Sequence, residues 1–170
     1  MQRFEDDIDA VVAETCEMAK LSTEMLERAI QAVTDGDVDL ADSIIADQAR
    51  IEKFDDEIED AAIRILTLYQ PTAVDTRAVA TILKSITHLE RIAKYSTNIA
   101  TATKYLADKP SYEVVDLIEP VGEMALSLVK RVVTGFENKS IDGFKSIRET
   151  DDRLDDAMKE DLERIVDFIN

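Results

Sequence analysis

The side chains that could do chemistry in this sequence are almost all carboxylates. The chain contains a single histidine, His88, and a single cysteine, Cys16. One histidine excludes a histidine-based metal or catalytic site within one chain, and we expect His88 to be half-exposed on a helix. We expect Cys16 to be a small buried apolar residue. Because the sequence has no Ser-His-Asp set, phosphate-binding glycine loop or dinucleotide fingerprint, we expect no enzyme.

One pair of carboxylates has the spacing of metal ligands. Asp151 and Asp155 lie four residues apart, which puts both on one face of a helix. Asp151 also falls on an apolar stripe, between Ile147 and Leu154, where a carboxylate must find a partner or reach solvent. Two carboxylates alone bind cations weakly. If a metal site exists, we expect it at Asp151 and Asp155 with further ligands from a second chain.

The charge of the chain limits its partners. The sequence holds 37 Asp and Glu against 20 Lys and Arg, a formal net charge of −17. Such a surface repels phosphate backbones and anionic lipid, so we expect neither nucleic-acid binding nor direct membrane insertion. Metal cations and basic patches of other proteins are better candidates. An ordinary solvated acidic surface and a salt-rich cytoplasm stay open as other reasons for the charge.

The elements that position these residues are predicted to be long helices. The chain of 170 residues has 45% hydrophobic residues but 4 Gly and 3 Pro, so it can bury a core and has few turn formers. Apolar residues recur at helical spacing, and no segment alternates with the period of a strand. The pattern breaks near Gly36, Pro71, Pro110 and Lys139. We therefore predict an all-α antiparallel bundle of five helices with short connections.

Local signals refine these boundaries. Gly36 is expected to close the first helix in the left-handed conformation, and Asp37 to cap the second. The third helix is expected to begin near Asp75. Pro120 either kinks the fourth helix or marks its true start.

The expected location is the cytoplasm. A single cysteine allows no intramolecular disulfide, which fits a reducing compartment. Residues 1–7 lack the apolar run of a signal peptide, and no apolar stretch is long enough to cross a bilayer.

Three motifs resemble those of the PhoU family of phosphate-uptake regulators. Residues 70–77, QPTAVDTR, resemble the family's Q-P-x-A-x-D-L-R hinge between its second and third helices. Residues 89–94, LERIAK, with NIA at 98–100, resemble its L-E-R-I-G-D…N-I-A run. Residues 36–41 resemble the opening of its second helix. The motifs occur in the family's order and spacing.

The resemblance implies a fold of two similar three-helix halves. Residues 1–109 correspond to a three-helix first half. Residues 110–170 correspond to a partial second half of two helices, in which residues 151–155, DDRLD, resemble the family's D-x-x-V-D run. The sixth helix of the family pattern would follow Asn170. Either a short member of the family or a truncated chain would give this pattern.

Members of this family are associated with metal clusters held by E/D-x-x-x-D pairs on facing helices. In an antiparallel hairpin about Pro71, Glu90 lies level with residues about twenty before the proline. This places Gln48 and Glu52 opposite Glu90 and Lys94. Two of the four acidic ligands are then missing, and Lys94 puts a positive charge where a metal would sit. We expect no metal there, and an ion pair between Glu90 and Lys94 instead.

The resemblance implies a regulator of phosphate uptake. It would contact the ATPase subunit of the phosphate ABC transporter and a phosphate-sensing histidine kinase, and no cofactor is expected. Two alternatives stay open. One is a metal-binding bundle that takes divalent or iron-type cations, and the other is a dimeric helical scaffold unrelated to phosphate.

The last two helices are expected to form a homodimer interface. Two helices cannot cover their own apolar stripes, and the open face would be larger than soluble monomers usually tolerate. That face consists of Val121, Leu128, Val132, Ile147, Leu154 and Ile165. The alternative is that both helices fold back onto the first three helices of the same chain.

Overall fold

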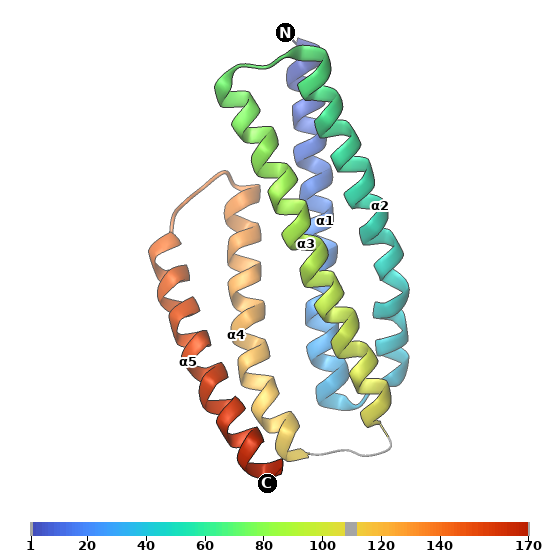
Figure 1. Cartoon of the computed structure of the whole chain (residues 1–170), viewed down its shortest axis with the longest axis vertical. Helices are drawn as coiled ribbons and strands as arrows, with labels where there is room; N and C mark the ends of the chain where they lie inside the picture. The colour runs from blue at the N-terminus through green and yellow to red at the C-terminus, as the bar shows by residue number, and fades with distance from the viewer. Residues whose placement is uncertain (1, 108–111, 170) are drawn as a thin grey trace.

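The structure is a computed structural model that describes residues 2–107 and 112–169, and every described element is an α-helix (Figure 1). The five helices are α1 (Gln2–Asp35), α2 (Val38–Tyr69), α3 (Ala73–Leu106), α4 (Tyr112–Glu137) and α5 (Phe144–Ile169). Successive helices run antiparallel. The prediction of a five-helix all-α bundle is therefore confirmed.

The helix ends follow the local signals in most places. Gly36 has a φ of 67°, and the Asp37 side chain caps α2 by accepting a 2.9 Å hydrogen bond from the Leu40 backbone N–H. Gln70 ends α2 in the left-handed region, with a φ of 43°, and Lys139 lies between α4 and α5 with a φ of 50°. Pro110 lies outside the described residues.

The structure gives more detail at two predicted boundaries. α3 begins at Ala73, two residues before Asp75 and in line with the predicted start near it, because Thr72 is the last residue with extended backbone before the helix. Asp75 lies in the first turn, where it accepts a 2.7 Å hydrogen bond from the Thr72 hydroxyl. Pro120 lies inside α4 and does not mark its start. A proline removes a single N–H donor, so the rest of the helical ladder carries the helix past it.

The core lies between α1, α2 and α3. Four isoleucines at seven-residue spacing on α2 are all buried, namely Ile44, Ile51, Ile58 and Ile65. Alanines also lie fully buried in this core, including Ala29, Ala62, Ala93 and Ala100, each with 0% exposure. Repeated spacing of large residues on one stripe gives each helix a continuous inward face.

α4 and α5 form a hairpin that joins the bundle through one helix (Figure 1). Over the described residues α4 packs against α1 and α5, whereas α5 packs against α4 alone. α4 comes close to α1 at Gly122, where a Cβ atom would lie 3.1 Å from Cγ1 of the buried Ile30. The hairpin thus packs, through α1, against the bundle of the first three helices of its own chain, which was the predicted alternative to the homodimer.

The face proposed for a homodimer is partly covered within the chain. Leu128 is buried, and Val121, Ile147 and Leu154 are half-buried, whereas Val132 is 53% exposed. The Ile165 side chain lies outside the described ones. The expectation that the whole face lies open was therefore wrong, because α1 and the hairpin itself cover most of it. The homodimer stays a prediction.

Two further features concern membranes and domain boundaries. Across residues 2–107 and 112–169, no helix is long and apolar enough to span a bilayer. The predicted division into residues 1–109 and 110–170 falls within the segment 108–111, outside the described part, and stays a prediction.

Two reactive side chains are more exposed than predicted. Cys16 is half-buried and not fully buried. Burial, followed by the nearby Glu137 carboxylate, raises the pKa of its thiol. His88 is exposed and not half-exposed, because its neighbour Leu89 takes the inward position on α3.

Candidate functional site

Polar side chains line the outer edge of the contact between α2 and α3. The Thr97 hydroxyl on α3 donates a 3.2 Å hydrogen bond to Gln48 Oε1 on α2. The Gln48 amide donates a 3.3 Å hydrogen bond to Glu52 Oε1, one helical turn along α2. Further toward the hinge, Asp55 on α2 feels the negative charge of Glu90 on α3. We call the residues Gln48, Glu52, Asp55, Glu59, Glu90 and Thr97 the α2–α3 seam.

The predicted pairing along this seam was wrong by about one turn. Gln48 was predicted to lie opposite Lys94, but it accepts its hydrogen bond from Thr97. Glu52 was predicted to lie opposite Glu90, but it is Asp55 whose pKa the charge of Glu90 raises. Side chains of a helix lean toward its N-terminus. At any height along an antiparallel pair, the side chains that meet therefore belong to residues further along the chain, on both helices, than a count of Cα positions predicts.

The predicted ion pair between Glu90 and Lys94 is also absent from the salt bridges of the described residues. Lys94 is exposed. An exposed pair contributes only about 0–1 kcal/mol, too little to hold two flexible side chains together.

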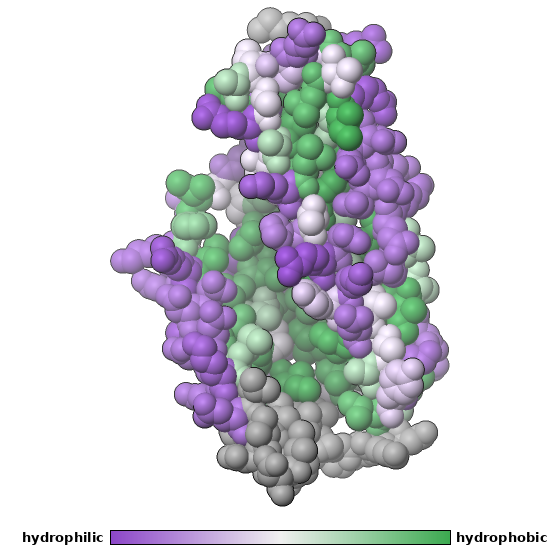
Figure 2. All heavy atoms as spheres, in the orientation of Figure 1, coloured by the Kyte–Doolittle hydropathy of each residue, from purple (hydrophilic) through white to green (hydrophobic). Residues whose placement is uncertain are grey.

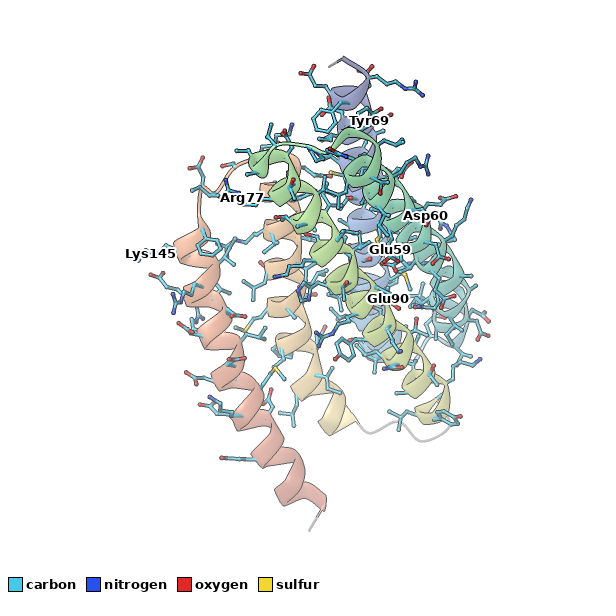
Figure 3. All side chains as sticks on the ribbon, turned by 45° about the horizontal axis from the view of Figure 1, so that its top comes forward. Glu59, Asp60, Tyr69, Arg77, Glu90 and Lys145 are labelled. Atoms are coloured by element: carbon cyan, nitrogen blue, oxygen red, sulfur yellow. The ribbon has the colours of Figure 1, made fainter. Side chains whose placement is uncertain are left out.

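The seam gathers negative charge near one half-buried group. Burial, followed by the charges of Glu90, Glu59 and Asp56, raises the pKa of Asp55. Figure 3 shows Glu59 and Glu90 near each other, on the two helices that form the seam. Carboxylates that raise one another's pKa are favoured partners for a cation or a basic protein surface.

The described residues do not fit the metal cluster that the family resemblance implies. Over the described part of the chain, no three or more His, Cys, Asp or Glu side chains lie together in a way that could hold a metal ion. Asp151 and Asp155 are both exposed on α5. A metal at Asp151 and Asp155 would thus need ligands from outside the chain, and stays a prediction.

A second half-buried carboxylate on α2 has the opposite environment. Burial alone would raise the pKa of Asp47, but hydrogen bonds and charge from Arg28 and Arg50 outweigh burial and lower it. The Arg50 guanidinium donates a 2.8 Å hydrogen bond to Asp47 Oδ1, and Arg28 on α1 binds the other oxygen. Asp47 therefore ties α1 to α2 in its charged form.

We expect Asp47→Asn and Asp55→Asn to change stability in opposite directions. At pH 7, Asp47→Asn should lower the free energy of unfolding and Asp55→Asn should raise it, the latter by less than about 1 kcal/mol because the group is partly solvated. The Asp55 difference should fade as pH falls through the raised folded-state pKa of Asp55 toward the ordinary Asp value of 3.8, and the Asp47 difference should fade below 3.8, as pH falls toward the lowered folded-state pKa of Asp47. The stabilisation by charged Asp47 is lost on protonation, and the repulsion at Asp55 is relieved. Urea unfolding at pH 7 and pH 3 measures this, and equal signs at pH 7 would contradict it.

The hinge end of the bundle holds a second polar contact. The Tyr69 hydroxyl donates a 2.6 Å hydrogen bond to Asp7 Oδ2, and the Tyr69 ring meets the Phe4 ring edge-on at 5.2 Å. These contacts fix the first turns of α1 against the hinge formed by Gln70 and Pro71. No sequence pattern pointed to them, because the partners lie far apart along the chain.

The sequence is similar to a known protein family and to named members of it. The PhoU domain family matches residues 15–103. The phosphate-specific transport system accessory protein PhoU homolog of Aquifex aeolicus is 30% identical over 93% of this chain and 71% of its own length. The homolog of Clostridium acetobutylicum is 25% identical over 98% of this chain and 77% of its own length.

Solved structures show the same fold. The crystal structure of PhoU from Pseudomonas aeruginosa superposes with a TM-score of 0.90 at 24% identity, over 98% of this chain and 80% of that one. The phosphate transport system regulatory protein PhoU from Streptococcus pneumoniae gives a TM-score of 0.85 at 23% identity, over 96% and 77%.

The five long antiparallel helices form an all-α bundle with the PhoU fold. The family match covers more than half of the chain, from α1 to nearly the end of α3. The chain belongs to the PhoU family, which confirms the resemblance that the motifs indicated.

Proposed function

We propose that this protein regulates phosphate uptake through contacts between helix faces and partner proteins, and that it catalyses no reaction. The observation that supports this most is family membership along nearly the whole chain. Relatives that match 93–98% of it are named accessory proteins of the phosphate-specific transport system. The cytoplasm is the proposed location, because an accessory protein of this kind meets its partners there.

The proposed partners are the ATPase subunit of a phosphate ABC transporter and a phosphate-sensing histidine kinase. The net charge of −17 favours partners with basic patches. The α2–α3 seam supplies one face of suitable charge, with Glu52 and Glu59 exposed and Asp55 half-buried among other carboxylates.

Capture of purified partners tests this proposal. We expect the immobilised protein to bind the ATPase subunit, the kinase or both, and the bound fraction to fall as salt screens the charges. An unrelated acidic helical bundle serves as the control for non-specific attraction. If neither partner binds at micromolar concentration, the proposed function as a phosphate regulator is wrong, and the alternative of a helical scaffold unrelated to phosphate is favoured.

Two finer parts of the proposal concern self-association and metal. Val132 and Met158 are 53% and 54% exposed, and a homodimer through α4 and α5 would cover them. Light scattering that gives a monomer mass would reject this dimer. Asp151 and Asp155 would bind a divalent or iron-type cation with ligands from the second copy. Elemental analysis of protein purified without chelator that finds no bound metal would reject this site.

A further inference from the structure

Charge is distributed unevenly over the five helices, and α3 differs from the other four. α3 contains 5 basic and 2 acidic side chains, a net charge of +3. Its neighbour α2 contains 9 acidic and 3 basic ones, and α1, α4 and α5 also contain more acidic than basic side chains. Because the whole chain has a net charge of −17, the chain outside α3 has a net charge of −20.

Three basic side chains of α3 follow one line along the helix. Arg77, Lys84 and Arg91 are seven residues apart, and all three are exposed. Seven residues make almost two helical turns, so these side chains project in nearly the same direction, about 10 Å apart. Val79 and Ile86, which are buried with 1% and 3% exposure, lie on the opposite side of the helix. We call Arg77, Lys84 and Arg91 the α3 basic row.

The α3 basic row is not neutralised within the described part of the chain. Lys104, further along α3, is paired with Asp42 on α2. Over residues 2–107 and 112–169, by contrast, no side chain of the basic row forms an ion pair. Arg91 contacts Tyr95 instead, with its guanidinium carbon 6.0 Å from the centre of the ring. The three positive charges can therefore pair with carboxylates of another molecule.

The basic row is separate from the hollow between α3 and the α4–α5 turn. The α3 residues that line this hollow are Ala78, Thr81 and Ile82. Figure 2 shows hydrophilic side chains at intervals along α3 on the face turned toward the viewer, beside a denser hydrophilic surface over α2. The row is thus a line of positive charge about one helix wide, with the carboxylates of the α2–α3 seam along one side.

We propose that the α3 basic row docks a helix of a partner protein that carries carboxylates at seven-residue spacing. Such a helix presents its carboxylates along one line, at the same intervals of about 10 Å as the row. In coiled coils, charged pairs at this spacing select the partner helix and its orientation. Val74 and Tyr95, 67% and 55% exposed, lie three residues before the row and four after it, and offer apolar contacts at its two ends.

This inference rests on the proposed function, since it names a surface through which a regulator would bind its partner. The width of the row favours a single helix over a membrane or a nucleic acid. Packed helices lie about 8–10 Å apart, which is about the distance over which salt screens charges at physiological ionic strength. A broad anionic surface would therefore meet exposed carboxylates of α2, such as Glu52 and Glu59, together with the row.

A nucleic-acid strand has a related disadvantage. It carries a phosphate charge about every 3.4 Å, so most of its phosphates would face the acidic remainder of the molecule. A protein helix can carry its carboxylates only at the positions that face the row, and so avoids this repulsion.

A second copy of this chain is a weaker candidate for the occupant. Its α5 carries Glu149, Asp156 and Glu163, which are exposed and seven residues apart. However, Glu149 and Asp156 are already paired with Lys145 and Lys159 on the same helix. Two copies with a net charge of −17 each also repel one another.

A titration with synthetic peptides, followed by NMR, tests the proposal because it detects weak binding between exposed charges. The aligned peptide is a helix of about 20 residues with Glu at i, i+7 and i+14, Leu near both ends, and Ala and Gln elsewhere. The scattered peptide has the same composition, with the three Glu residues spread around the helix.

At low salt we expect the aligned peptide to bind at least about threefold more tightly than the scattered one, and added salt to weaken its binding. The largest shifts of backbone amide signals should fall in residues 77–91. Equal affinity of the two peptides, or no binding of the aligned peptide, would overturn the proposal.

A charge reversal in the middle of the row locates the site. Lys84→Glu should leave the fold intact, because Lys84 is exposed. It should weaken binding of the aligned peptide by about three- to tenfold, since it replaces attraction by repulsion. Arg64→Glu makes the same change of net charge at an exposed position on α2 and should have a much smaller effect. Parent-like binding by Lys84→Glu, or an equal loss in Arg64→Glu, would contradict the proposed site.

Two measurements test the other occupants. Self-association in light scattering that Lys84→Glu abolishes would assign the row to a second copy, against the proposal. Vesicles of phosphatidylglycerol and phosphatidylcholine that bind the parent but not Lys84→Glu would assign it to a membrane, also against the proposal. We expect neither result.

Capture of the transporter ATPase and the kinase separates this inference from the proposed function. If either protein binds the parent and Lys84→Glu equally, the proposed function stands and the docking site at the basic row fails. If the aligned peptide binds as expected but neither protein does, the docking site stands and the proposed function fails.

Discussion

Replacing Ile51 by alanine is expected to lower the free energy of unfolding by about 2–5 kcal/mol. Ile51 has 0% exposure and lies midway along α2, inside the cluster formed by α1, α2 and α3. Removing three of its carbon atoms forfeits their burial and leaves a cavity that three long, mutually packed helices cannot readily close. Urea unfolding followed by circular dichroism measures the loss.

Ile63→Ala is the matched control, because it makes the same change on the same helix at a side chain 49% exposed. Its effect should stay well below that of Ile51→Ala, since less apolar area is removed from the folded state. Equal losses at the two positions would show that the α1–α3 core does not hold Ile51 as described.

The second large effect is expected at Gly122, where Gly122→Val should detach the hairpin of α4 and α5. A Cβ atom alone would lie 3.1 Å from Ile30 Cγ1, and valine adds two further methyl groups at the same place. Ile30 is buried, with 7% exposure. Overpacking of this kind typically costs about 1–3 kcal/mol, more than the better helix propensity of valine restores.

Limited proteolysis or hydrogen exchange measures this detachment. The rates of cleavage and exchange should increase in α4 and α5 and stay unchanged in α1 to α3. Ser127→Val adds the same branched side chain at an exposed position on α4 and should keep the hairpin in place. A Gly122→Val protein with parent-like protection in α4 would show that Ile30 gives way easily.

The helices and the core could be predicted because their signals are local and repeated. The heptad spacing of Ile44, Ile51 and Ile58 defines the buried stripe of α2 whatever the partners of that stripe are. Gly36 and Asp37 mark a helix boundary by their own backbone and capping chemistry. Such features need no knowledge of the rest of the chain.

The seam and the contacts between distant helices depend on how these elements meet, and prediction from the sequence was weaker there. The pairing of Asp55 with Glu90 follows the lean of side chains, which a count from Pro71 leaves out. The contact between Tyr69 and Asp7 joins residues 62 positions apart. The hydrogen bonds from Arg131 to Ser146 and Thr150 carried no sequence signal, because they depend on how α4 and α5 pack together.

Over the described residues α5 packs against α4 alone, and this has a consequence for how the molecule opens. The amide hydrogens of each cooperative unit exchange at a rate set by the free energy of opening that unit. A helix that packs against a single neighbour has the lowest free energy of opening. α5 should therefore visit an unfolded state while the first three helices stay native.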